Sequence, residues 1–83
     1  MSLESFERLS PREQNVLISL MKGATARQIA EKDCVSLATV RSQIRSIISK
    51  LGVSSQLAAV VLAYQSGWPE TSGDGWREKR SAV

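Results

Sequence analysis

The sequence contains no histidine and a single cysteine, Cys34, among its 83 residues. One cysteine cannot form a disulfide within the chain, and without histidine or further cysteines the chain lacks the ligands of a zinc finger. No apolar run reaches the roughly 20 residues that span a bilayer, and no signal peptide is visible. We therefore expect a cytoplasmic protein that holds no metal and no other cofactor.

Acidic residues are missing from a long central stretch. Between Cys34 and Pro69 there is no Asp or Glu, whereas Arg41, Arg45 and Lys50 all fall within it. Because the formal net charge is only +3, the distribution of charge says more than its total. Positive charge concentrated in one segment favours an anionic polymer as the partner.

Catalytic patterns are absent as well. The sequence has no nucleophile–base pair, no phosphate-binding glycine loop and no paired carboxylates placed for a cleft. It predicts a binding protein and not an enzyme.

What the sequence does contain is a series of four helical segments. Ser10-Pro11-Arg12-Glu13 combines a capping box with a proline in the first turn, and Thr25 to Gln28 repeats the capping box. Serines and glycines mark the remaining ends. The expected segments, caps included, are 10–23, about 25–33, 36–52 and 54–67. Since no alternating strand pattern is present, we predict an all-α fold.

These segments predict one domain over residues 9–67. Residues 1–8 are interpreted as a lead-in, and the opening Met-Ser-Leu is equally typical of a start added for expression. Residues 68–83 hold proline and glycines among charged residues, so we expect a mobile tail there. Trp68 is the part of this tail that we expect to lie against the core.

The segment 37–51 has two contrasting faces. DNA's major groove is about 12 Å wide and admits a helix whose outward side chains are short or able to bind, and an acid there would be repelled by phosphates. The preceding short helix and turn complete a helix-turn-helix unit. A purely solvated outer face is the alternative interpretation. The apolar stripe comprises Val40, Ile44, Ile47, Ile48 and Leu51, and the opposite side carries Ser42, Arg45, Ser46 and Ser49, with Arg41 and Lys50 on its flanks.

Several spaced motifs resemble the LuxR/GerE-type helix-turn-helix domain of bacterial transcription regulators. They are Leu9-Ser-Pro-Arg-Glu13, Gly23-x-Thr-x-x-Gln-Ile29-Ala30, Val35-Ser36-x-x-Thr39-Val40-Arg41 and Lys50-Leu51-Gly52-Val53. The DNA-binding region of sigma factors shares part of this pattern, but the last motif favours LuxR/GerE. The resemblance implies a four-helix domain without a wing that binds double-stranded DNA as a dimer. It also implies an N-terminal sensor or receiver domain, which we do not expect within these 83 residues.

The resemblance also implies roles for single residues. Arg41, Ser42 and Arg45 match the positions that contact base edges. Gln43 stands where histidine is frequent, and an amide also hydrogen-bonds a phosphate. The positions that match contacts to the DNA backbone are Thr25, Ser36, Thr39, Gln43 and Lys50.

The last helical segment is apolar on both sides. We expect Leu57, Val60, Val61 and Tyr64 to face the core, which leaves the other side for a second interface. A homodimer through that outer side is our interpretation, and a helix covered by Trp68 or the tail is the alternative. A helical protein-interaction module using this segment is the second function considered. The expected dimer interface comprises Ala58, Ala59, Leu62 and Ala63.

Overall fold

Four helices begin at the hydroxyl caps that the sequence indicates. The computed structural model describes residues 4–69, and within that range it contains five α-helices and no strand, so the predicted all-α fold is confirmed. The extra helix is a single turn at the N-terminus that the sequence did not predict. The helices are α1 (Glu4–Glu7), α2 (Pro11–Met21), α3 (Ala26–Asp33), α4 (Leu37–Leu51) and α5 (Gln56–Ser66).

Reciprocal hydrogen bonds explain why α2 and α3 begin where they do. The Ser10 hydroxyl accepts from the Glu13 N–H at 3.2 Å, and the Glu13 carboxylate accepts from the Ser10 N–H at 2.9 Å. Thr25 and Gln28 make the same pair of bonds at 3.1 and 2.8 Å. Both predicted capping boxes are therefore present. They satisfy N–H groups that have no partner inside the helix.

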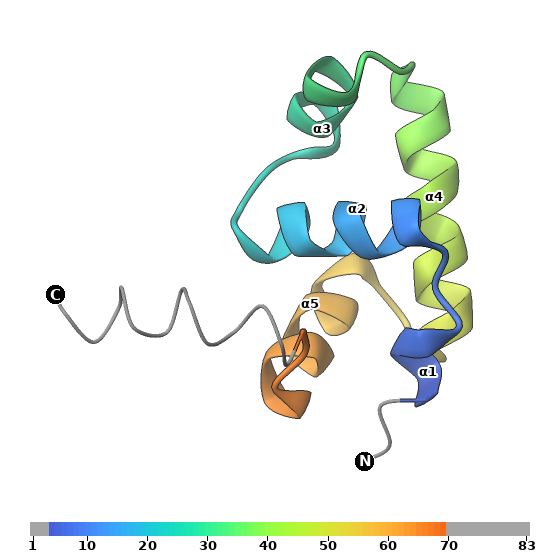
Figure 1. Cartoon of the computed structure of the whole chain (residues 1–83), viewed down its shortest axis with the longest axis vertical. Coiled ribbons are helices and arrows are strands. Elements are labelled where there is room, and N and C mark those ends of the chain that lie inside the picture. The colour runs from blue at the N-terminus through green and yellow to red at the C-terminus, as the bar shows by residue number, and fades with distance from the viewer. Residues whose placement is uncertain (1–3, 70–83) are drawn as a thin grey trace, which may run out of the picture.

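The longest helix, α4, contacts every other helix (Figure 1). In Figure 1, α2 crosses beside the middle of α4, α3 lies near its N-terminal end, and α1 and α5 lie near its C-terminal end.

Among the described residues, no single helix is long and apolar enough to cross a membrane. Only α4 and α5 together, bent by 56°, pass that test of length and composition.

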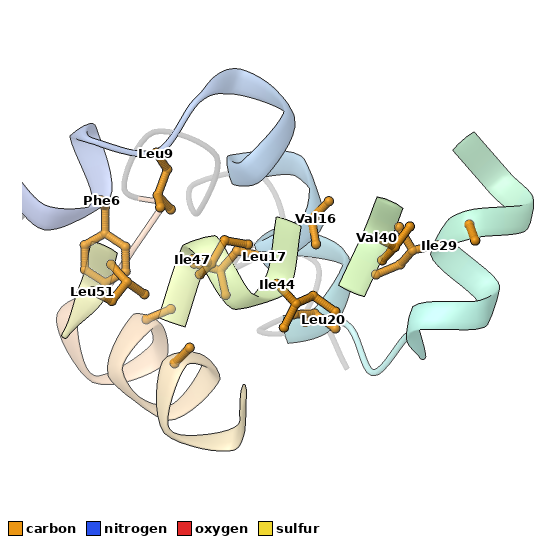
Figure 2. Close-up of a cluster of buried hydrophobic side chains, with 13 residues drawn as sticks. Phe6, Leu9, Val16, Leu17, Leu20, Ile29, Val40, Ile44, Ile47 and Leu51 are labelled. Carbon is orange, nitrogen blue, oxygen red and sulfur yellow. The ribbon is translucent and has the colours of Figure 1, made fainter. Parts of the chain in front are cut away.

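The core forms along the apolar stripe of α4 (Figure 2). Four of the five residues predicted for this stripe are buried and Ile48 is partly buried, so the predicted inner face of α4 is confirmed. Figure 2 shows Ile44 and Ile47 beside side chains of α2, with Val40 next to Ile29 of α3. The core comprises Phe6, Leu9, Val16, Leu17, Leu20, Ile29, Ala30, Val40, Ile44, Ile47, Leu51, Ala59 and Ala63.

The orientation expected for α5 is wrong. Ala59 and Ala63 are 1% and 0% exposed and belong to the core, whereas Leu57 is 71% exposed. Val61 and Tyr64 are also exposed, and Val60 is only partly buried. Alanines let α5 approach α2 and α4 closely, so the small side of the helix turns inward and the large side chains turn outward.

The ordered domain extends beyond both ends expected from the sequence. Phe6, in the region interpreted as a lead-in, is 1% exposed and stacks on Trp68 with 5.2 Å between ring centroids. The expectation that Trp68 lies against the core is therefore confirmed. The mobile tail was predicted to continue to Val83, but residues 70–83 lie outside the described part of the chain.

Candidate nucleic-acid interface

The outer face of α4 presents short and basic side chains. Arg41, Ser42 and Arg45 are all exposed, at the i, i+1 and i+4 spacing that places them on one side of the helix. Ala38 and Ser49 are exposed as well and extend this face toward both ends of α4. No acidic residue occurs in α4. The same helix therefore buries one side in the core and leaves a basic, acid-free side exposed.

A left-handed residue sets the turn between α3 and α4. Cys34 has φ 57° and ψ 42°, and its exposed thiol is free. The next N–H, that of Val35, bonds to the Ala30 carbonyl at 3.0 Å. This pattern closes the end of α3 and redirects the chain within two residues. Ser36 then caps α4, so the two helices are joined by a short and defined turn.

Hydroxyl groups stand at the exposed N-terminal ends of α3 and α4. Thr25, Ser36 and Thr39 are all exposed. The Ser36 hydroxyl accepts from the Thr39 N–H at 3.0 Å and lies 2.9 Å from the Thr39 hydroxyl. Helix N-termini carry partial positive charge and favour anions such as phosphate. Contacts of these three residues with the DNA backbone stay a prediction.

Gln43 differs from the other expected backbone contacts in its surroundings. It is half-buried, and its Oε1 atom is buried without a hydrogen-bond partner among residues 4–69. A buried amide oxygen without a partner is uncommon in folded proteins. Any contact of Gln43 with a phosphate would have to use the Nε2 hydrogens, because only they donate.

One carboxylate joins the start of α2 to the C-terminal half of α4. Glu13 is 8% exposed. Its Oε2 accepts from the Ser46 hydroxyl at 2.6 Å, and its Oε1 lies 2.8 Å from the Lys50 ammonium. The Lys50 ammonium also donates to the Arg8 carbonyl at 3.4 Å. The expectation that Ser46 lies on the outer side of α4 is wrong, because its hydroxyl points toward α2.

These contacts change the acidity of Glu13. Burial by itself raises the pKa of this carboxyl group. Hydrogen bonds from Lys50, Ser46 and the Ser10 N–H, together with the positive charge of Lys50, outweigh burial and lower the pKa from 4.5 to about 2. Glu13 is therefore ionised at neutral pH, and its charge is compensated within the domain.

Comparison with known proteins agrees with this geometry. The luxR family of bacterial regulatory proteins matches residues 7–63. Response regulator protein VraR from Staphylococcus aureus is 34% identical over 62 residues, and the proteins of the same name from Staphylococcus saprophyticus and Staphylococcus epidermidis give the same values. The alignment covers 75% of this chain and 30% of each relative.

The family match covers more than half of the chain and includes α2, α3, α4 and the turns between them. It decides between the two families that the sequence motifs left open. The chain belongs to the luxR family of bacterial regulatory proteins, whose helix-turn-helix domain binds DNA in transcription regulation.

Proposed function

We propose that this domain binds a specific DNA sequence by placing α4 in the major groove. The observation that carries the proposal is the exposed, acid-free face of α4 with Arg41, Ser42 and Arg45 on it. An α-helix with its side chains is about 10–12 Å across, which matches the roughly 12 Å width of the groove. Small residues such as Ser42 let the helix axis approach the base edges closely.

The two arginines and the serine have distinct chemical uses in this proposal. A guanidinium donates two parallel hydrogen bonds to O6 and N7 of guanine, the commonest specific contact in the major groove. The Ser42 hydroxyl donates or accepts at either kind of base edge. Arg41 and Arg45 are one turn apart, so they would reach neighbouring base pairs of one half-site.

Phosphate contacts would then fix the position of α4 in the groove. Thr25 lies at the start of α3, Ser36 and Thr39 lie at the start of α4, and Gln43 lies one turn further along. Their hydroxyl, amide and N–H groups would donate to phosphate oxygens on either side of the groove.

We further propose that the domain acts as a homodimer through α5. Leu57, Val61 and Tyr64 follow i, i+4 and i+7 spacing and form an exposed apolar stripe. Of the interface residues expected from sequence, Ala58 and Leu62 flank this stripe, while Ala59 and Ala63 lie in the domain's own core. The second function considered, a protein-interaction module, would use the same stripe for a different partner.

A two-fold axis would place two copies of α4 about 34 Å apart, one turn of DNA. The bound site would then be an inverted repeat. The chain spans about 30% of the length of the relatives that it matches. We propose that it is the DNA-binding domain of a longer cytoplasmic regulator whose remaining part receives the signal.

Selection of bound duplexes from a randomised DNA pool tests this proposal. The 83-residue chain is expected to enrich two inverted half-sites with centres about 10 base pairs apart. Enrichment of a single half-site would support sequence-specific DNA recognition and would contradict the proposed dimer. A pool that shows no enriched sequence after repeated rounds would contradict sequence-specific binding.

A further inference from the structure

The Glu13 carboxylate holds α4 at two points on the same side of the helix. Ser46 and Lys50 are four residues apart, one turn of helix, and both donate to Glu13. Glu13 itself is fixed, because its Oε1 also accepts from the Ser10 N–H in the capping box of α2. The base-reading half of the domain is therefore connected to α2 through one nearly buried charged group.

These two points lie between the buried and the exposed faces of α4. Successive residues of a helix are about 100° apart. Ser46 is thus about 100° from buried Ile47 on one side and about 100° from exposed Arg45 on the other. Lys50 repeats this placement one turn later.

This placement matters because the two kinds of contact restrain different motions. Apolar contacts along the stripe are non-directional, so they hold α4 down but allow it to rotate slightly about its axis. Hydrogen bonds depend on direction and are lost when the angle changes. A rotation of about 20° moves a point on the surface of a helix by roughly 2 Å. Such a shift would take Arg45 away from a base edge.

We propose that Glu13, Ser46 and Lys50 are positioning residues that fix the rotation of α4 for base reading. Lys50 then acts through Glu13 and not as a phosphate contact, which departs from the role that the resemblance implies. This inference rests on the proposed function, since it concerns how α4 reads DNA.

Charge compensation also argues against a phosphate contact by Lys50. Its ammonium is 2.8 Å from a carboxylate that stays ionised, and it also donates to the Arg8 carbonyl. A contact with a phosphate would have to use the one remaining N–H of the ammonium, or Lys50 would have to leave Glu13 while that carboxylate is 8% exposed. Breaking such a pair is costly because the remaining charge stays desolvated.

The salt dependence of binding separates the two roles of Lys50. Affinity is measured by mobility shift for the selected site and for a scrambled duplex, at several salt concentrations, with wild type, Lys50→Gln and Ser46→Ala. A phosphate contact contributes about 0.9 to the slope of log affinity against log salt. A positioning residue changes the ratio of specific to non-specific affinity and leaves the slope unchanged.

We expect Lys50→Gln and Ser46→Ala each to lower that ratio by roughly three- to thirtyfold. Lys50→Arg, which keeps the ion pair, should restore most of the ratio. Lys32→Gln removes the same charge from an exposed site on α3 and serves as the matched control. Circular dichroism shows whether each variant is folded. If Lys50→Gln does not fold, Ser46→Ala tests the positioning role by itself.

Two results would overturn the proposal while leaving the proposed function intact. The first is a slope reduced by about one unit in Lys50→Gln, with equal losses on both duplexes. The second is an unchanged ratio in Ser46→Ala and in Lys50→Gln. Wild type that binds the two duplexes equally would instead refute the proposed function itself.

Discussion

Arg45 is exposed on α4 and directly precedes Ser46, which is bonded to Glu13. Its side chain is therefore accessible to a partner, next to a residue that is bonded to α2. Arg41 shares this face one turn earlier. At the scale of single residues, we propose that these two arginines distinguish one base pair from another.

Replacing Arg45 by alanine should reduce affinity for the selected site by about 1–3 kcal/mol and relax the preference at one base position. The reason is that the variant would lose the bidentate contact with a base edge that we propose for Arg45. Binding to a panel of single-base variants of the site measures this effect. Arg12→Ala, at an exposed position of α2, is the control. Equal losses on every sequence would show that Arg45 contacts a phosphate.

Glu13 should make the stability of the domain depend on acid pH. Its pKa is about 2 in the folded state against 4.5 ordinarily, so the unfolded chain binds a proton at a higher pH than the folded chain. The stabilisation is complete above about pH 5.5 and is lost as pH falls from 4.5 toward 2. This stabilisation amounts to roughly 3 kcal/mol. Urea unfolding from pH 7 to pH 2.5 measures it.

In Glu13→Gln this part of the pH dependence should be absent, while the rest of the acid unfolding remains. A variant that loses stability with the same pH profile as wild type would show that Glu13 does not carry the effect. Ser46→Ala, which removes one donor only, should give an intermediate profile.

Some of these residue properties follow from the sequence and others do not. The exposure of Arg41, Ser42 and Arg45 follows from the helical period once the apolar stripe is known. The partners of Glu13 do not, because Ser46 and Lys50 are 33 and 37 residues away along the chain. Local patterns predict which side of a helix faces inward, but they do not say which polar groups meet across two helices.

At the scale of elements, the helix ends were more predictable than the orientation of α5. The sequence places the N-cap of α5 at Ser54 or Ser55 and its end near Gly67, and the structure has Ser55 and Gly67 as the caps. Its rotation was predicted wrongly because apolar residues surround the whole helix, so periodicity does not distinguish a core side. In the structure the side of α5 that carries Ala59 and Ala63 is buried, and α5 contacts both α2 and α4. The short α1 was missed because a single turn carries no periodic pattern.

A pair of substitutions in α5 tests its observed orientation. Ala59→Leu places a large side chain in a filled core and should destabilise the domain by about 1–3 kcal/mol. Leu57→Ala, at a position 71% exposed, should change the stability by less than about 0.5 kcal/mol. Urea unfolding followed by circular dichroism gives both values. The reverse order of effects would mean that the larger side of α5 faces the core.

At the scale of the whole molecule, the domain separates two surfaces. One is the exposed face of α4, which is basic and free of acids. The other is the apolar stripe of Leu57, Val61 and Tyr64 on α5. The Tyr64 hydroxyl donates to the Met21 carbonyl, which ties part of this stripe to the end of α2. A second copy bound at α5 would leave both α4 helices free for DNA.

Leu57→Asp should weaken cooperative binding of two copies to an inverted repeat, because a charge in an apolar interface is desolvated without a partner. Sedimentation on the selected site should change from two chains per duplex toward one. Gln56→Asp adds the same negative charge at a position about 100° away from Leu57 around the axis of α5. This control should leave two chains bound per duplex. Unchanged two-to-one binding by Leu57→Asp would reject the interface on α5.

The salt dependence of wild-type binding tests sequence-specific DNA recognition most directly. Affinity for the selected site and for its scrambled form is measured by mobility shift across a range of salt concentrations. Both should fall linearly on a log–log plot, since each phosphate contact adds about 0.9 to the slope, and the selected site should remain bound more tightly by at least about a thousandfold. No binding to either duplex at low salt, or equal affinity for the two duplexes, would contradict sequence-specific DNA recognition.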